Sequence, residues 1–199
     1  MVEISKKLLM LVGDFSEDYE VMVPYQALTM LGYTVHTVSP SKKPSDTIAT
    51  SIHDFEGFQT YTEKRGHNFQ INYDLLSVKT KDYLGLIIPG GRAPEFLREN
   101  EEILKIVKGF FEENKPICTI CHGPQILCAA GGMKGVEMTA YPACKSEVLA
   151  AGGKFVGEKG VYDNVVVDEK HKIVSTPAWS GQPGVLRKFV ELLGGSFKI

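Results

Sequence analysis

The chain has 199 residues, a length that suits one domain with a sizeable buried core. Hydrophobic residues make up 43% and charged residues 23%, which is typical of a globular protein and excludes a disordered or fibrous chain. The net charge of -2 gives no basic footprint for nucleic acid or an anionic membrane, and no stretch approaches the roughly 18 apolar residues of a membrane span. We therefore expect a single domain over residues 1–199, in the cytoplasm, with neither nucleic acid nor membrane as a partner.

Short apolar runs alternate with amphipathic segments along the chain, which is typical of βαβ units around a parallel sheet. Continuous runs rich in leucine and β-branched residues indicate strands that are covered on both faces. Such strands are predicted at Lys7–Val12, Thr34–Val38, Leu84–Ile88 and Ile117–Ile120, with a further sheet edge at Val136–Ala140. The first run ends at Gly13, too early for the core of a signal peptide.

Helices are predicted at Glu20–Leu31, Glu95–Asn114, Pro124–Ala130, Ser146–Ala151 and Val185–Leu193. Gly32 and Gly194 follow the first and last of these helices and are suited to left-handed caps. Close to the C-terminus, Val165–Val167 and Ile173–Ser175 flank a polar tetrapeptide and predict a hairpin added to the sheet.

The segment 41–81 lacks clear periodicity. It contains four aromatic residues within 51–69, namely Phe55, Phe58, Tyr61 and Phe69, so it is too apolar for a disordered linker. We expect an ordered excursion close to the functional site or at a subunit interface.

The four cysteines do not resemble a disulfide framework in a chain of this length. Cys118 and Cys121 have the C-x-x-C spacing of redox and metal sites, but residues three apart on a strand face opposite sides of the sheet. A zinc site also needs a second pair of ligands, and none has a suitable spacing. We therefore predict no metal or other cofactor, and we assign Cys118, Cys128 and Cys144 to packing.

The segment Ile120-Cys121-His122-Gly123-Pro124 follows a buried strand and precedes a helical run. This is the layout of a nucleophile elbow at the C-terminal edge of the sheet. The thiol of Cys121 should face the positive end of the next helix, which favours the thiolate, and the backbone N–H of His122 could donate to an oxyanion. The alternative is an inert buried cysteine, which the neighbouring histidine and the turn make less favourable.

Two further segments follow predicted strands at the same edge of the sheet. Gly90-Gly91 lies between a strand and a helix, where tandem glycines allow close backbone approach and the N–H of Gly91 could be a second oxyanion donor. Asp14, Glu17, Asp18 and Glu20 form an acidic run, which usually means a solvated loop. Glu20, however, begins an amphipathic helix and could point inward as an acid or base beside the cysteine.

The motifs around Glu20, Gly90-Gly91 and Cys121, in this order over nearly the entire chain, resemble the ThiJ/PfpI superfamily. The resemblance implies a flavodoxin-like three-layer α/β sandwich with a mostly parallel central sheet. The segment from His53 to Phe69 is similar to the plant branch of the superfamily that carries glyoxalase III activity. Those plant proteins are usually two tandem copies and this chain has one, so the interface within a tandem chain would need a second subunit here.

The resemblance also implies roles for single residues. Cys121 would be the nucleophile, Glu20 the carboxyl that holds the thiol and shuttles a proton, and His122 the histidine of a Cys–His pair. Glu95 would be the acidic partner of the histidine, supplied across a subunit interface in a homo-oligomer between dimer and hexamer. The peptide groups of Gly91 and His122 would hold the oxyanion.

Gly90, His53 and His67 complete the predicted substrate-binding set, and for both histidines a surface or structural role is an equally good interpretation. Trp179 could edge the pocket, although packing accounts for it better.

With a small dicarbonyl such as methylglyoxal, these groups predict glutathione-independent conversion to lactate, or deglycation, through a hemithioacetal on Cys121. One alternative is a PfpI-type peptidase or amidase in which Cys121, His122 and Glu95 form an acyl-enzyme from a peptide. Adjacent residues do not easily place an imidazole against the preceding thiol, which argues against that chemistry. The other alternative is a non-enzymatic redox-sensing or chaperone protein, in which Cys121 oxidises to a sulfinic acid beside Glu20.

Overall fold

The computed structural model describes residues 6–157 and 164–196. Its centre is a six-stranded sheet, with five parallel strands and one antiparallel edge strand. In spatial order the strands are β2 (Thr34–Val38), β1 (Lys7–Leu11), β5 (Gly85–Ile88), β6 (Ile117–Ile120), β10 (Ile173–Thr176) and β9 (Val166–Asp168). The predicted α/β class, the central strands and the C-terminal hairpin are confirmed.

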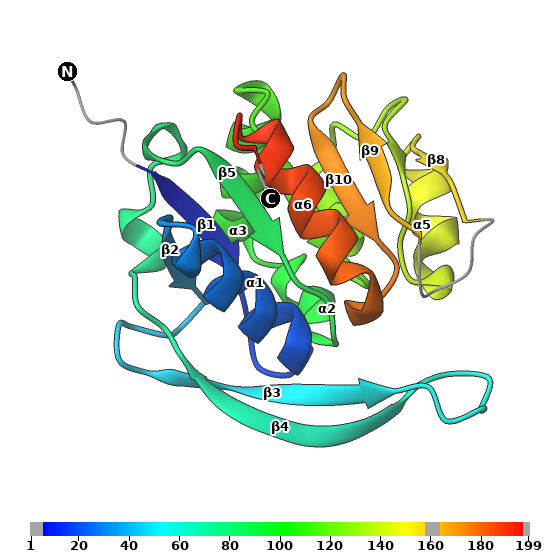
Figure 1. Cartoon of the computed structure of the whole chain (residues 1–199), viewed down its shortest axis with the longest axis horizontal. Helices are drawn as coiled ribbons and strands as arrows, with labels where there is room; N and C mark the ends of the chain where they lie inside the picture. Colours follow the sequence, from blue (N-terminus) through cyan, green and yellow to red (C-terminus); the bar gives the residue numbers. More distant parts are fainter. Residues whose placement is uncertain (1–5, 158–163, 197–199) are drawn as a thin grey trace.

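Helices cover both faces of this sheet (Figure 1). One face carries α1 (Asp18–Met30) and α6 (Gln182–Leu192); the other carries α2 (Ala93–Leu97), α3 (Glu101–Glu112), α4 (Pro124–Ala130) and α5 (Lys145–Ala150). Successive side chains of a strand point to opposite faces, so Leu9 and Leu11 of β1 enter one core and Leu8 and Met10 enter the other. All four are fully buried, which explains the continuous apolar pattern of the strand.

The prediction of one long helix at Glu95–Asn114 is wrong, because the structure has two helices there, α2 and α3. Between them, the side chain of Asn100 accepts a hydrogen bond of 3.1 Å from the backbone N–H of Ile103 and caps α3. The remaining predicted helices are found within a few residues of their expected bounds. Gly32 and Gly194 have φ angles of 85° and 84°, as left-handed caps require.

The excursion at 41–81 is a long hairpin of β3 (Thr47–Asp54) and β4 (Thr62–Gln70), followed by the short 3-10 helices η1 (Leu75–Ser77) and η2 (Thr80–Asp82). The hairpin runs across the carboxyl ends of the central strands (Figure 1). Backbone hydrogen bonds fasten β3 to the loop after β1: Phe15 N–H donates to Ala49 and Ser51 N–H donates to Ser16. The hairpin is therefore positioned over the edge where the predicted site lies.

The segment Val136–Ala140 does not form an edge of the central sheet. Only β7 (Glu137–Met138) is a strand, and it pairs with β8 (Lys154–Phe155) in a separate two-stranded sheet. Asp168 of β9 accepts a hydrogen bond of 2.8 Å from the Glu137 N–H, so β7 is attached to the sheet by a side chain and not by a strand ladder.

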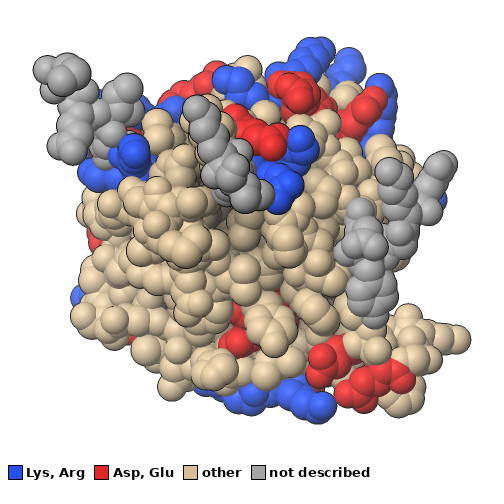
Figure 2. All heavy atoms as spheres, in the orientation of Figure 1, with Lys and Arg blue, Asp and Glu red and all other residues tan. Residues whose placement is uncertain are grey.

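The face in Figure 2 carries its charged side chains mainly along the upper and lower edges, with a largely uncharged area between them. Among the residues that the structure describes, no helix combines the length and the apolar composition that a membrane span requires. The remaining 3-10 helices, η3 (Pro142–Cys144) and η4 (Trp179–Gly181), follow β7 and β10.

Candidate active site

Cys121 occupies a sharp turn between β6 and α4, and its φ angle of 57° is rare for a residue with a side chain. Its N–H donates to the Thr176 carbonyl (3.0 Å) and its carbonyl accepts from Tyr141 (2.9 Å), which fixes the strained conformation from both sides. A methyl group at Gly123 would come within 2.4 Å of the Ile88 carbonyl, so only glycine allows the helix to start this close to the sheet. The geometry is that of the predicted elbow.

His122 lies against the thiol. Its Nδ1 atom is 3.1 Å from Sγ of Cys121, so the expectation that adjacent residues do not easily make this contact is wrong. The positive φ of Cys121 turns the two side chains toward the same space. The imidazole stacks on Tyr141 (centroids 4.8 Å apart) and meets Tyr61 edge-on (5.7 Å). Burial, with a contribution from His53, lowers the pKa of His122 to about 4, so the ring is neutral at pH 7.

The tandem glycines after β5 are packed against the elbow. A methyl group at Gly90 would come 2.6 Å from Cβ of Cys121 and 2.7 Å from the backbone N of His122. Gly91 has a φ angle of 76°, and its N–H faces the Cys121 sulfur, where it lowers the pKa of the thiol and favours the thiolate. The peptide groups of Gly91 and His122 thus lie beside the sulfur, where an oxyanion donor has to be.

Glu20 in the first turn of α1 is fully buried beside the thiol. Its Oε2 atom accepts a hydrogen bond of 2.7 Å from Gly90 N–H. Burial and the nearby Glu17 raise the pKa of Glu20 well above the ordinary carboxyl value, while Gly90 and Cys121 act in the opposite direction. The expectation that Glu20 points inward is confirmed, and its raised pKa favours the protonated carboxyl.

Glu17 is a second buried carboxyl that the sequence did not single out. It caps α1 by accepting a hydrogen bond of 2.9 Å from Glu20 N–H, and its own N–H donates to Gly90. Burial raises its pKa from 4.5 to about 7. The acidic run is therefore not a solvated loop: Glu17, Asp18 and Glu20 are all buried. An N-cap position before Glu20 is the signal that could have found Glu17.

Cys121 is 4% exposed, and this burial determines the acidity of its thiol. Burial is the main cause that raises its pKa well above the ordinary value, the neighbouring Glu20 carboxyl would add to this once ionised, and the Gly91 N–H only partly opposes them. The expectation that the helix end alone favours a thiolate is wrong, because a buried thiolate loses more hydration than one short helix returns. A thiolate at this position therefore requires a proton acceptor, and His122 is in contact.

The remaining three cysteines are free thiols without such partners. Cys118 and Cys144 are buried and Cys128 is partly buried. Burial raises the pKa of Cys144 to about 12 and that of Cys128 to about 11, so both stay protonated. Among the described residues, no three His, Cys, Asp or Glu side chains converge as a metal site would require.

His53 lies in β3 with only 3% of its surface exposed. Its Nε2 atom is 2.9 Å from Oε2 of Glu63, and its ring stacks on Tyr61 at 4.2 Å. Because Tyr61 in turn contacts His122, the structure brings His53 to the edge of the candidate site. Burial lowers the pKa of His53, so the ring is neutral at pH 7.

The structure places two other predicted site residues, His67 and Glu95, at the surface. The side chain of His67 is 75% exposed and pairs with Asp18 at 3.2 Å, where it fastens β4 to α1 instead of reaching the thiol. Glu95 is exposed in α2, on the helix that follows the tandem glycines. It lines a cavity of about 340 Å³ together with Phe15, Arg92 and Phe96.

Aromatic rings from the hairpin and from η4 surround the elbow, a feature that the sequence indicated only as unplaced aromatics. Tyr61 packs edge-on against Tyr141 at 5.3 Å, and Phe55 stacks on Tyr141 and Trp179 at 6.4 and 6.5 Å. The indole N–H of Trp179 donates to the His53 carbonyl (2.9 Å), so Trp179 also anchors β3. These rings restrict access to Cys121.

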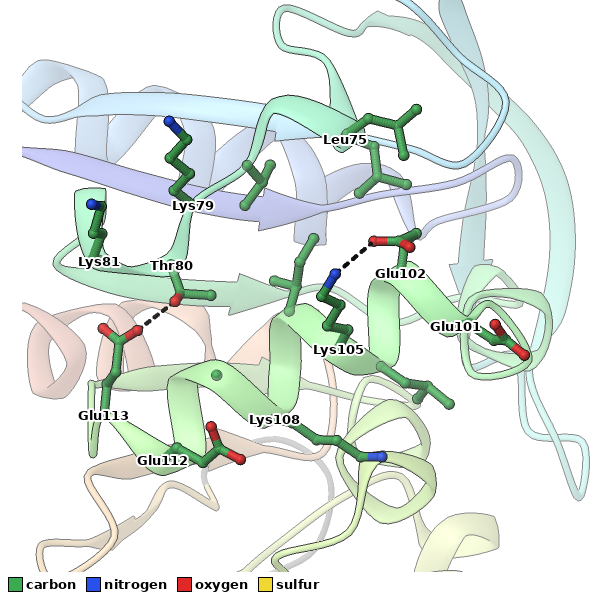
Figure 3. Close-up of a pocket in the computed structure, with 15 residues that line it drawn as sticks. Leu75, Lys79, Thr80, Lys81, Glu101, Glu102, Lys105, Lys108, Glu112 and Glu113 are labelled. Atoms are coloured by element: carbon green, nitrogen blue, oxygen red, sulfur yellow. Dashed lines mark hydrogen bonds and ion pairs between the residues drawn. The ribbon is translucent and has the colours of Figure 1, made fainter.

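A larger cavity of about 850 Å³ lies elsewhere, between α3 and the segment of η1 and η2 (Figure 3). Both signs of charge line it, including the ion pair of Lys105 with Glu102 and the hydrogen bond between Thr80 and Glu113. None of the residues around Cys121 lines this cavity, so we do not assign it to the site.

Comparison with known proteins identifies the family. A sequence model of the DJ-1/PfpI family matches residues 6–192. The chain belongs to the DJ-1/PfpI family. It is 47% identical over 190 residues to Protein DJ-1 homolog D of Arabidopsis thaliana, covering 96% of this chain and 48% of that protein. It is also 33% identical over 187 residues to Deglycase PfpI of Pyrococcus furiosus, covering 94% of this chain and 99% of that one.

The chain thus spans about half the length of the plant relatives that it matches. The resemblance to the ThiJ/PfpI superfamily and to its plant branch is confirmed at the level of the family. Among solved structures, Drosophila melanogaster DJ-1beta superposes with a TM-score of 0.76 at 18% identity, covering 96% of this chain and 91% of that one. This similarity confirms the fold.

Proposed function

We propose that the chain is a cysteine-dependent enzyme that converts methylglyoxal to lactate without glutathione, by a hemithioacetal on Cys121. The same chemistry serves the removal of dicarbonyl adducts, as the name of the archaeal deglycases suggests for those proteins. The observation that carries the proposal is the buried contact of one thiol with a neutral imidazole, beside a buried carboxyl whose pKa is raised. An acid and a base on the same adduct are what a proton transfer between neighbouring carbons needs.

The first step forms the hemithioacetal. Neutral His122 accepts the thiol proton, and the sulfur of Cys121 attacks the aldehyde carbon. The aldehyde oxygen becomes an oxyanion, which the N–H groups of Gly91 and His122 stabilise. The imidazolium then returns its proton to this oxygen, so the adduct and both side chains are neutral again.

The second step moves hydrogen between the two carbons. His122 removes the proton from the former aldehyde carbon while Glu20 protonates the ketone oxygen, which gives an enediol. Glu20 recovers its proton from the hydroxyl on the sulfur-bearing carbon, and His122 protonates the neighbouring carbon. The product is a lactoyl thioester of Cys121, and water hydrolyses it to lactate and the free thiol.

The test is to incubate the purified protein with methylglyoxal in the absence of glutathione and to measure lactate. We expect activity in the wild type, and a loss of at least about a hundredfold in Cys121→Ser and Glu20→Gln, since each removes a group of the chemical step. Cys128→Ser is the matched control, because it removes a thiol outside the elbow. Lactate at background level with the wild type, or equal activity in Cys121→Ser, contradicts the proposal.

A second candidate is hydrolysis of a peptide or amide by an acyl-enzyme on Cys121. One observation favours it, namely the 3.1 Å contact between the thiol and His122, which is the arrangement of a Cys–His pair. Assays with casein and with small amide substrates separate the two functions. Cleavage that depends on Cys121 and exceeds lactate formation would reverse our ranking.

We further propose that the enzyme is a cytoplasmic homo-oligomer in which Glu95 of one subunit supports His122 of the next. The exposure of Glu95 and its place on the helix after the tandem glycines support this arrangement. Its test is described at the end of the Discussion.

A further inference from the structure

Glu63 of β4 is bound to the loop that carries the tandem glycines. Its carboxylate makes a two-point ion pair with Arg92, with Oε2–Nε and Oε1–Nη2 distances of 2.8 Å each. Arg92 directly follows Gly91, and its guanidinium lies over the ring of Phe15 at 4.5 Å. This ion pair joins the hairpin to the loop whose Gly91 N–H faces the Cys121 sulfur.

The same carboxylate is also connected to His122 by the contacts of two further side chains. Oε2 of Glu63 lies 2.9 Å from Nε2 of His53, whose ring stacks on Tyr61. Tyr61 meets the imidazole of His122 edge-on at 5.7 Å. A continuous set of contacts therefore runs from the loop of the oxyanion donors, through one ion pair, to the proposed proton acceptor.

We propose that the ion pair of Glu63 with Arg92 is a positioning clamp, which holds the Gly91 N–H at the reacting sulfur and Tyr61 over the site. This inference rests on the proposed function, because it explains how that site is kept in its working geometry. Neither residue is assigned to the chemical step.

The exposure of the pair distinguishes such a clamp from a stabilising ion pair. The side chains of Arg92 and Glu63 are 45% and 30% exposed, and ion pairs exposed in this way contribute little to the stability of a fold. A displacement of about 1 Å in an active site, in contrast, can reduce the rate about a hundredfold. Loss of the clamp should therefore reduce catalysis with little effect on the melting temperature.

The experiment measures kcat, KM, the melting temperature and the alkylation rate of Cys121 by iodoacetamide in Glu63→Gln, Arg92→Gln and the double variant. We expect each single variant to lower kcat about tenfold and to change KM less than threefold. We also expect alkylation of Cys121, followed by peptide mass mapping, to be at least threefold faster, because Tyr61 no longer covers the thiol. Since the two residues act as one unit, kcat of the double variant should be no lower than kcat of the less active single variant.

Lys64→Gln is the matched control, since it removes the ion pair of Lys64 with Glu56 on the same hairpin. It should leave kcat and alkylation within twofold of the wild type. The clamp is overturned if Cys121 is alkylated at the wild-type rate in Glu63→Gln, or if the losses in the two single variants add in the double variant. If the wild type forms no lactate, the proposed function fails, and the alkylation rates still decide whether the clamp exists.

Discussion

Gly90 is the residue whose side chain the site cannot accommodate. A Cβ atom there would lie 2.6 Å from Cβ of Cys121, 2.7 Å from the backbone N of His122 and 2.8 Å from Oε2 of Glu20. All three groups would have to shift, and two of them are fixed by the backbone of the elbow. We predict that Gly90→Ala lowers kcat/KM for lactate formation by at least about a hundredfold, measured beside circular dichroism to confirm folding.

Gly131→Ala provides the matched control. Gly131 also follows a secondary-structure element, with a φ angle of 80°, but an added methyl group there meets open space within the described part of the chain. The substitution should cost about 1–3 kcal/mol of stability because of the backbone strain and should leave kcat/KM unchanged. Equal losses of activity in both variants would show that the effect of Gly90→Ala is not specific to the site.

The buried carboxyl of Glu17 should make the stability depend on pH. The folded protein keeps the Glu17 proton up to a pKa of about 7, whereas the unfolded chain releases it near 4.5. Stability is therefore lost as the pH rises between these values, and Glu20 acts in the same direction. Glu17→Gln removes the ionisation but keeps an acceptor for the N–H of Glu20.

We predict that, relative to the wild type, Glu17→Gln gains on the order of 3 kcal/mol in the free energy of unfolding between pH 4 and pH 8. Urea titrations at both values measure it. Glu99→Gln, at a side chain that is 78% exposed, should follow the wild type at both values. Parallel curves for Glu17→Gln and the wild type would mean that Glu17 ionises as freely in the fold as in the unfolded chain.

The sequence was informative where the signal is local. The elbow at Cys121 and the inward-facing Glu20 in the first turn of α1 each follow from a few neighbouring residues, so both positions could be predicted. The contact of His122 with the thiol could not, because it depends on a positive φ angle at Cys121 that the sequence does not reveal. Tyr61 was also missed as a neighbour of His122, since they meet only after the hairpin folds across the sheet.

At the scale of elements, the boundary between α2 and α3 shows that a continuous apolar pattern can hide the start of a new helix. The apolar pattern continues from α2 into α3, so it predicted one helix, whereas Asn100 followed by acidic residues is an N-cap signal inside that pattern. We predict that Asn100→Ala lowers the free energy of unfolding by about 1 kcal/mol and leaves lactate formation unchanged. Asn100→Asp should keep wild-type stability, and an equal loss in both variants would argue against capping.

The hairpin of β3 and β4 could not be predicted for a different reason. Apart from Phe69, the side chains of β4 are exposed or half-buried, so the strand has no buried face to impose an alternation. Polar contacts attach the hairpin to α1: Asp18 accepts hydrogen bonds from the N–H of His67 (2.9 Å) and from the Thr50 hydroxyl. Contacts between a helix start and a distant hairpin leave no periodic signal in the sequence.

At the scale of the whole molecule, the chain spans about half the length of its plant relatives, and the homo-oligomer that we propose stays a prediction. Phe96 is 66% exposed and Phe15 is 37% exposed, and both line one cavity with Glu95. Exposed aromatic rings around a carboxylate are consistent with a surface that another subunit covers. We predict that the protein is at least a dimer by light scattering, and that Glu95→Gln lowers kcat about tenfold.

Mixing two impaired variants tests whether Glu95 acts across the interface. Cys121→Ser has no nucleophile and Glu95→Gln lacks the carboxylate, so neither homo-oligomer contains a complete site. In a mixed dimer, the subunit that carries Glu95→Gln keeps its Cys121 and receives Glu95 from the Cys121→Ser subunit. Lactate formation in the mixture should therefore exceed the sum of the separate variants once subunits have exchanged. If Glu95 acts within its own subunit, no mixture contains a complete site and the activities only add.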